Sequence, residues 1–475
     1  MSNFESFKRI FKGEIVEPSS PEYSEAIARW AKNAERNARY VLFPKDEQDV
    51  SEAVKFARAN NLPLAVKGGG HNPSGASSID DGVSIDLNRH FNTARIDPEN
   101  KLGYVGGGAL WKTVDHAAIE HGLATPGGTV NHTGVGGLIL GGGFGYLSGK
   151  HGLTIDNLVQ ATVVLADGSI VTASDTSHPD LLWGLRGGGG NFGIVTEFVL
   201  KLHPQRRTVF GGFVVFPPNV LEQVVAAVDN WWNEAQENEM IMLGFTRGPD
   251  KSPGIMAILF YNGSEKEGRQ RFKPLLDIGP AVDLAKEIPY EQLNGMLNQA
   301  ANAHGRRYYM TGTSLKSSIS AHATEVFRRT VEFTEKHPTN ASLAPYEVFI
   351  IYELLPNHNI CKISPDATAY RSRGPQANVL VMASWDEEED VKDVDVKHAR
   401  AFSREITGII NASAEREPKE YENQGYGNYT TDPTDLIKRS LELWGNNYPR
   451  LQKIKHKYDP TCVFNRWIPI QPSAT

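Results

Sequence analysis

The chain of 475 residues contains only two cysteines, Cys361 and Cys462. This number excludes the disulfide framework of small secreted domains and fits a reducing compartment. No apolar run approaches the ~20 residues of a membrane span, and the N-terminus lacks the continuous apolar segment of a secretory signal. The sequence therefore predicts an intracellular, cytoplasmic protein that contacts no membrane.

Basic residues are not in excess either. The 49 Lys and Arg residues face 56 Asp and Glu residues, which gives a formal net charge of −7. Such a balance provides no electrostatic reason to bind nucleic acid. The chain is also too long for one hydrophobic core, so two or three domains are expected. We expect a monomer that acts on a small molecule, without a metal site or a nucleic-acid partner.

Glycine, by contrast, is abundant at 45 residues, and its clusters all lie in the first 195 residues. They occupy positions 68–70, 106–108, 127–128, 134–137, 141–145 and 187–190. Glycine has no side chain to bury, so these segments suit a backbone that wraps a large ligand and donates N–H groups to its phosphates. The asymmetry predicts a glycine-rich, ligand-binding part followed by a more ordinary α+β part.

Local patterns support this division. Asp46 is placed to cap a helix whose apolar positions follow helical spacing, and Asp167-Gly168 predicts a β-hairpin. From about residue 206 the sequence pattern changes, and expected strands are separated by expected helices. This pattern indicates a separate α+β domain. The expected strands are 213–216, 241–245, 255–261, 348–354 and 378–385, and the expected helices are 221–234 and 322–336.

The familiar nucleotide-binding motifs are missing. The sequence has no G-x-x-x-x-G-K-[ST] phosphate loop, and Gly141 and Gly143 lack the third glycine of G-x-G-x-x-G. No strand–helix unit surrounds them, so a nicotinamide-binding Rossmann domain is disfavoured.

Several motifs together resemble a known family. They are Lys67–His71 with Ser74-Gly75, Thr125–Gly128, Gly134–Gly145, Lys150–Leu153, Trp183–Gly193, Tyr426–Tyr429 and Lys455–Asp459. Their order and spacing are similar, over nearly the whole chain, to those of the vanillyl-alcohol oxidase-type FAD proteins, in the berberine-bridge-enzyme-like branch.

The resemblance implies an α+β fold with two domains of the PCMH-type FAD-binding architecture. Residues 1–205, with a core of about 36–205, would form the FAD-binding domain. Residues 206–415 would form a substrate-binding domain of antiparallel sheet covered by helices. Residues 416–475 would return to the FAD domain.

The resemblance also implies covalent FAD. The position of His71 is that of the histidine joined to the flavin 8α-methyl carbon, and this histidine must be neutral to act as a nucleophile. Many relatives carry a second link through a cysteine at the position of Val130, so attachment through His71 only is expected. The other implied cofactor-binding residues are Lys67, Gly68, Gly69, Gly70, Ser74, Gly75, Thr129, Gly134, Gly136, Gly137, Gly141, Gly142, Val195 and Asn428.

Three residues are candidates for the catalytic base. In relatives the tyrosines of the Tyr426–Tyr429 motif approach the reacting carbon, and we favour Tyr426 over Tyr429. A tyrosine accepts a proton only if its pKa, near 10, is lowered by its surroundings. His151 stands where relatives often have tyrosine and suits a base or hydrogen-bond donor. The alternative for all three is a packing role.

A carboxylate found in alcohol-oxidising relatives is not evident. Its position, just before Thr368–Arg373, corresponds to Ala367, so that base would be missing. Tyr352 and Glu353, on another expected strand, are possible substitutes.

The resulting hypothesis is an FAD-dependent oxidase. It would transfer a hydride from an alcohol, carbohydrate or secondary-metabolite carbon to flavin, with O2 reduced to H2O2. Trp231, Trp232 and Trp385 would line a sugar groove or belong to the core. Leu140, near the flavin, favours an alternative, a dehydrogenase with a non-oxygen acceptor, and Ala367 suggests another, a flavin-bearing protein with a degenerate site.

Overall fold

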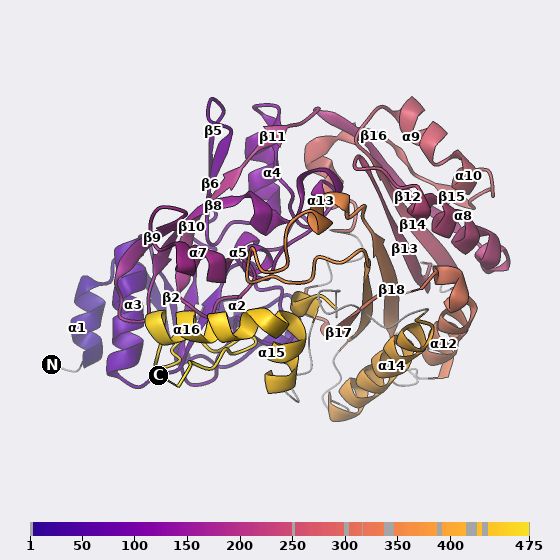
Figure 1. The fold of residues 1–475 in the computed structure, drawn as a ribbon. Coiled ribbons are helices and arrows are strands. Elements are labelled where there is room, and N and C mark those ends of the chain that lie inside the picture. The colour runs from indigo at the N-terminus through magenta and orange to yellow at the C-terminus, as the bar shows by residue number, and fades with distance from the viewer. Residues whose placement is uncertain are drawn as a thin grey trace.

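Two lobes share the chain (Figure 1). The computed structural model describes residues 3–248, 252–298, 304–315, 317–336, 346–386, 392–414, 425–429 and 436–474. The first lobe contains the N-terminal elements, and the second contains a large sheet whose outer face is covered by helices. The last two helices, α15 and α16, lie against the first lobe, so the chain ends near where it began (Figure 1).

The first lobe is built on two sheets. In the smaller sheet, β2, β4 and β3 run parallel, and the strand order is β1 (Glu14–Val16), β2 (Tyr40–Phe43), β4 (Val83–Asp86) and β3 (Leu64–Lys67). The second sheet is antiparallel, with the order β5 (Ala94–Asp97), β6 (Leu102–Gly106), β10 (Ile194–Lys201), β8 (Leu158–Val164) and β9 (Ile170–Ser174). A short pair joins β7 (Leu123–Ala124) to β11 (His203–Pro204).

Helix α3 (Glu47–Ala59) shows why the local predictions for this lobe succeed. The Asp46 side chain accepts a hydrogen bond from the Asp49 N–H, as expected of a cap, and the helix buries Val50, Val54 and Ala57. The predicted hairpin is also present as β8 and β9, with Gly168 at a φ of +84°. The other helices here are α1 (Asn3–Ile10), α2 (Tyr23–Ile27), α4 (Trp111–Ile119), α5 (Val135–Leu140), α6 (Ser148–His151) and α7 (Pro179–Leu185).

The second lobe is an antiparallel sheet. Its order is β15 (Val282–Asp283), β12 (Thr208–Phe216), β14 (Pro253–Tyr261), β13 (Glu239–Arg247), β18 (Glu347–Leu354), β19 (Asn378–Trp385) and β17 (Arg307–Ser314), and β16 (Lys286–Pro289) also pairs with β12. All five predicted strands are confirmed, and β15, β16 and β17 are additional ones. The helices of the lobe are α8 (Leu221–Asn233), α9 (Glu265–Arg271), α10 (Lys273–Leu276), α12 (Ala323–Lys336), α13 (His358–Cys361) and α14 (Lys392–Ala412).

Each face of this sheet contributes to a different core. Side chains on the helix-covered face join the packing of α8, α12 and α14, and Trp385 is fully buried there. Side chains on the other face belong to the core shared with the first lobe. Because both faces are covered, every residue of β19 is buried, and its sequence shows no alternation of apolar and polar residues.

The C-terminal segment is anchored by a buried ion pair. It contains α15 (Leu436–Trp444) and α16 (Tyr448–Tyr458), followed by an extended tail. The Lys455 ammonium donates to Asp459 Oδ2 at 2.6 Å and to the carbonyls of Asn191 and Phe464, each at 2.7 Å. Both side chains of the pair are 0% exposed. The three donors of Lys455 are all used, as a buried charge requires, and the tail is tied to the first lobe.

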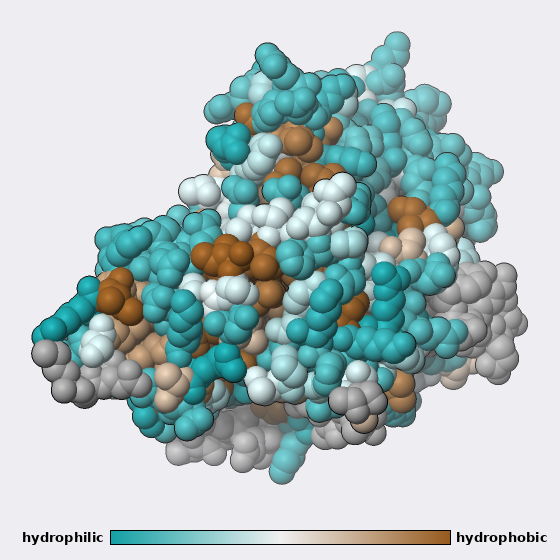
Figure 2. All heavy atoms as spheres, turned by 60° about the vertical axis from the view of Figure 1, so that its left-hand side comes forward, coloured by the Kyte–Doolittle hydropathy of each residue, from teal (hydrophilic) through white to brown (hydrophobic). Residues whose placement is uncertain are grey.

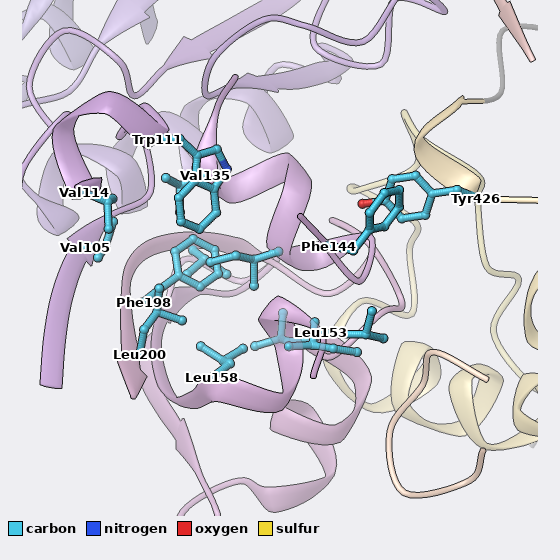
Figure 3. Packing of buried hydrophobic residues seen from close by; sticks show 14 of the residues in the cluster. Val105, Trp111, Val114, Val135, Phe144, Leu153, Leu158, Phe198, Leu200 and Tyr426 are labelled. Atoms are coloured by element: carbon cyan, nitrogen blue, oxygen red, sulfur yellow. The ribbon is translucent and has the colours of Figure 1, made fainter. Parts of the chain in front are cut away.

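The core of the first lobe reaches the C-terminal motif. Figure 3 shows Trp111 beside Val135, and Phe144 facing Tyr426, which comes from the distant C-terminal segment. The Phe144 and Tyr426 ring centroids are 4.9 Å apart.

The molecular surface is mostly polar on the side seen in Figure 2. Hydrophilic residues predominate on that face, and hydrophobic ones form small separate groups. Among the described helices, none has the length and apolar character that crossing a membrane would need.

Candidate active site

A cavity of about 360 Å³ lies where three parts of the chain meet. The glycine loops of the first lobe form one side, the inner face of the large sheet forms another, and residues from both 426–429 and 464–467 complete the lining. Its volume is in the range of small-molecule and cofactor sites.

The two main glycine loops touch each other as well as the cavity. A Cβ on Gly69 would lie 2.4 Å from the Gly134 nitrogen, and a Cβ on Gly134 would lie 2.3 Å from the Gly69 nitrogen. No side chain fits at either position, because the two backbones are in contact. Part of the glycine content therefore serves loop-to-loop packing rather than ligand contact, which the sequence alone did not indicate.

The first loop presents free backbone donors to the cavity. The N–H groups of Gly69, Gly70 and His71 have no hydrogen-bond acceptor among the described residues, and all three residues line the cavity. Successive free N–H groups of this kind bind anionic groups such as phosphates. Arg466, from the C-terminal tail, adds a cationic side chain to the same lining.

His71 is held by two rings. Its imidazole stacks on Trp30 with centroids 4.9 Å apart and an interplanar angle of 11°, and its Nε2 lies 2.6 Å from Nδ1 of His132. Burial, with smaller contributions from His132 and His304, lowers the pKa of His71 well below its usual value. The ring is therefore neutral at neutral pH. When Nε2 donates to His132, the lone pair on Nδ1 of His71 is left free.

Most of the expected cofactor-binding residues lie together. Those that line the cavity are Gly68, Gly69, Gly70, His71, Thr129, Gly134, Gly136, Gly137, Gly141, Val195 and Asn428. Val130, the position of the second covalent link in relatives, also lines it. Cys361 and Cys462 do not.

Four expected residues do not line the cavity and have other contacts. Lys67 pairs with Asp86 at 2.7 Å, and the Ser74 hydroxyl donates to Asn72. Gly75 turns the chain at a φ of +84°. Gly142 has a φ of +117°, and a Cβ there would lie 2.7 Å from the Tyr370 ring. These residues shape the loops beside the cavity. Gly107, Gly189 and Gly190, from two further glycine clusters that the sequence pointed out, also line the cavity. Sequence reasoning missed Trp30, Arg466 and Trp467, which line it too.

A buried carboxylate stands beside the C-terminal tyrosines. The Tyr429 hydroxyl donates to Glu353 Oε1 at 2.8 Å, and both residues line the cavity. Glu353 is 3% exposed, and its Oε2 has no hydrogen-bond partner among the described residues. Burial raises the pKa of Glu353 to about 8, although its bond to Tyr429 opposes this. Burial and the Glu353 charge raise the pKa of Tyr429 well above 10.

Tyr426 has a different environment. Its hydroxyl accepts hydrogen bonds from the Gly143 N–H at 3.1 Å and from Asn428 Nδ2 at 2.8 Å. Burial raises the pKa of Tyr426. The two tyrosine rings meet edge to face, with centroids 5.0 Å apart. A tyrosine can act alone as a base only if its pKa is lowered. Because the pKa of neither tyrosine is lowered, neither can take a proton by itself.

Of the two substitutes that the sequence offered for the missing carboxylate, the structure places Glu353 of β18 at the cavity. Glu353 and Ile351 point into the cavity, whereas Tyr352 packs in the core on the opposite face of the sheet. This follows from the two-residue period of a strand. Ala367 does not line the cavity.

His151 lies outside the cavity lining, so the structure does not bring it together with the tyrosines. Its ring stacks on His203 with centroids 3.8 Å apart, and His203 Nε2 lies 2.7 Å from Asn157 Oδ1. Burial, together with the neighbouring His203 and Lys150, lowers the pKa of His151 to about 3. The three expected tryptophans are also elsewhere, because Trp231, Trp232 and Trp385 pack in the helix-covered core.

The residues of the cavity fit a flavin dinucleotide. Glycine backbones and free N–H groups suit a pyrophosphate, and a neutral histidine stands in the same loop. Consistent with this, a family model described as "FAD binding domain" matches residues 38–174, and one described as "Berberine and berberine like" matches residues 425–470.

Similarity to an FAD-linked oxidoreductase extends over nearly the whole chain. The FAD-linked oxidoreductase pgmH of Aspergillus terreus is 32% identical over 502 residues, covering 99% of this chain and 96% of that protein. The chain belongs to the berberine-bridge-enzyme-like FAD-linked oxidoreductases. These are part of the vanillyl-alcohol oxidase superfamily, so this berberine-bridge-like protein is an FAD-binding enzyme, as the sequence predicted.

Solved structures show the same fold. The 6-hydroxy-D-nicotine oxidase of Arthrobacter nicotinovorans has a TM-score of 0.85 at 24% identity, covering 98% of each chain. The glucooligosaccharide oxidase of Acremonium strictum, which carries a 6-S-cysteinyl, 8α-N1-histidyl FAD, has a TM-score of 0.81 at 24% identity, covering 100% of each chain. The two-domain PCMH-type architecture expected from the motifs is therefore confirmed.

Proposed function

We propose that this berberine-bridge-like protein is an oxidase that converts a substrate C–OH group to C=O and passes the electrons to O2. The observation that carries this proposal is the hydrogen bond of 2.8 Å between Tyr429 and the buried Glu353, at the wall of the FAD cavity. Bound FAD supplies the redox chemistry, taking a hydride from the substrate carbon and reducing O2 to H2O2.

The protein's own task is to take the hydroxyl proton. Tyr429 holds its proton because its pKa is raised well above 10. It accepts the substrate proton only as it passes its own proton to Glu353 Oε1. The tyrosine and the carboxylate therefore act together, and Glu353 must be ionised. Tyr426, held by Asn428 and the Gly143 N–H, orients the substrate beside this pair.

The rate of flavin reduction is expected to depend on pH. Glu353 has a pKa raised to about 8, so below that pH the carboxyl is protonated and cannot accept from Tyr429. The rate with a saturating substrate should fall about tenfold per pH unit below 8 and level off above it. Anaerobic stopped-flow measurements from pH 6 to 10 check this. A rate that is constant over the whole range would contradict the role of Glu353.

We also propose that FAD is attached through His71 alone. The neutral imidazole, with one nitrogen engaged by His132, has its other nitrogen free as a nucleophile. Val130 has no nucleophilic group, and neither cysteine lines the cavity. The Acremonium enzyme, with both a cysteinyl and a histidyl link, differs at this point.

Oxygen use is tested separately from substrate oxidation. The reduced protein, prepared anaerobically with dithionite, is mixed with air-saturated buffer, and flavin absorbance and H2O2 are followed. We expect reoxidation within seconds with one H2O2 per flavin. The second candidate function is a dehydrogenase with another acceptor, favoured by the bulky Leu140 side chain at the cavity. A flavin that stays reduced for minutes would establish that alternative and refute the oxidase.

A further inference from the structure

The cavity-facing side of the large sheet is apolar around one carboxylate. In the register of the sheet, Met382 stands opposite both Met310 and Phe349, Ile351 stands opposite Leu380, and Met242 stands opposite Glu353. Opposed residues of neighbouring strands share a face, so these side chains form one continuous surface. All of them line the cavity.

Glu353 is the one hydrogen-bonding side chain that the described part of this sheet presents to the cavity. Met242 and Asn378 stand opposite it on the neighbouring strands, and Asn378 does not line the cavity. The next residue of its own strand on this face is Ile351. Phe349 is the only aromatic ring on the described part of this surface. Trp231 and Trp385, which could have stacked on sugar rings, lie on the opposite face of the sheet.

A carbohydrate is poorly matched to such a surface. Sugars carry a hydroxyl on nearly every carbon, and each hydroxyl that loses water without gaining a partner weakens binding about tenfold or more. Methionine side chains are flexible and polarisable, and they adapt to apolar or flat ring systems. Met242, Met310 and Met382 give the surface this character.

We propose that the substrate is a predominantly apolar alcohol, with an aromatic or alicyclic body against the methionine-rich surface and a single hydroxyl directed at Tyr429 and Glu353. This inference rests on the proposed function of the same site. The C–H hydride goes to FAD, the O–H proton goes to the Tyr429–Glu353 pair, and the product is the corresponding carbonyl compound.

Substrate choice is tested by anaerobic flavin reduction with two sets of compounds. The first set is cinnamyl alcohol and cyclohexylmethanol, and the second is glucose and cellobiose. We expect kcat/KM for the better apolar alcohol to exceed that for either sugar by at least about 100-fold. Equal or faster reduction by a sugar would overturn the proposal.

A binding measurement separates the substrate class from the proposed chemistry. Benzyl methyl ether has an apolar body and no O–H group to oxidise. It is expected to perturb the flavin absorbance spectrum at millimolar concentration, whereas cellobiose is not. If no alcohol reduces the flavin but the ether still perturbs it, the proposed function fails and the apolar site stands. If neither the ether nor any apolar alcohol acts on the flavin, the apolar site is refuted.

Matched variants test whether the methionines of the large sheet cause the preference for apolar alcohols. Met310→Gln and Met382→Gln keep side-chain length and add polar atoms to the surface. Each should raise KM for the apolar alcohol about tenfold, while reduction by dithionite stays unchanged. Met256→Gln, at a partly buried position on β14 away from the cavity, serves as the control and should stay within about twofold of the parent. Equal effects at all three positions would assign the change to general stability and contradict the proposal.

Discussion

Replacing Tyr429 by phenylalanine is expected to lower the rate of flavin reduction by about 10²–10⁴-fold, the usual contribution of a positioned acid–base group. The substitution removes the hydroxyl that links the substrate to Glu353 and leaves the ring in place. Anaerobic stopped-flow reduction at saturating substrate measures the effect directly. The absorbance spectrum of the bound flavin should be retained, because no cofactor contact is assigned to the hydroxyl.

Two further variants test this assignment. Glu353→Gln keeps a hydrogen-bond acceptor for Tyr429 but removes the proton acceptor, so it should produce a comparable loss and abolish the rise in rate towards pH 8. Tyr426→Phe removes a hydroxyl that accepts from the Gly143 N–H and from Asn428 and that is proposed to orient the substrate but not to take its proton, so a loss of less than about tenfold is expected. If Tyr426→Phe has the larger effect, Tyr426 is the base, as the sequence first suggested.

Replacing His71 by alanine is expected to move all of the flavin from the acid-precipitated pellet to the supernatant. The side chain is a neutral imidazole in the first glycine loop at the cavity, stacked on Trp30 and hydrogen-bonded to His132. The parent protein should give a yellow pellet whose flavin peptide, by mass spectrometry, contains His71.

The control for this experiment is the double variant Cys361→Ser/Cys462→Ser. Neither thiol lines the cavity, so its flavin should remain entirely in the pellet. A colourless pellet from the parent protein would refute covalent attachment. Flavin that remained in the pellet after His71→Ala would show a second link and refute attachment through His71 alone.

Local sequence signals predicted the elements they control. The Asp46 cap, the Asp167-Gly168 hairpin and the five strands of the large sheet depend on neighbouring residues, and all are present. Strand β17 was missed because its residues are covered unevenly on both faces and show no regular alternation. The glycine clusters predicted a backbone that wraps a ligand. They did not predict that the backbones of Gly69 and Gly134 are in contact, so that neither position has room for a side chain.

The pairing of Tyr429 with Glu353 could not be predicted from local signals. Glu353 lies 76 residues before Tyr429, near the end of a strand that is mostly apolar, and only the fold brings the two together. Conversely, the family resemblance placed His151 at a position that faces the substrate near the flavin. Its ring instead stacks on that of His203. His203 lies far from His151 in the sequence, so a local motif could not predict this contact.

The buried Lys455–Asp459 pair has a consequence for how the protein is made. It fixes the segment that carries Phe464, Arg466 and Trp467 to the cavity. The ribosome makes the glycine loops long before this segment, so a nascent chain that already contains the loops still lacks part of the cavity lining. The cavity is therefore complete only after residues 464–467 have been synthesised and have packed against the first lobe.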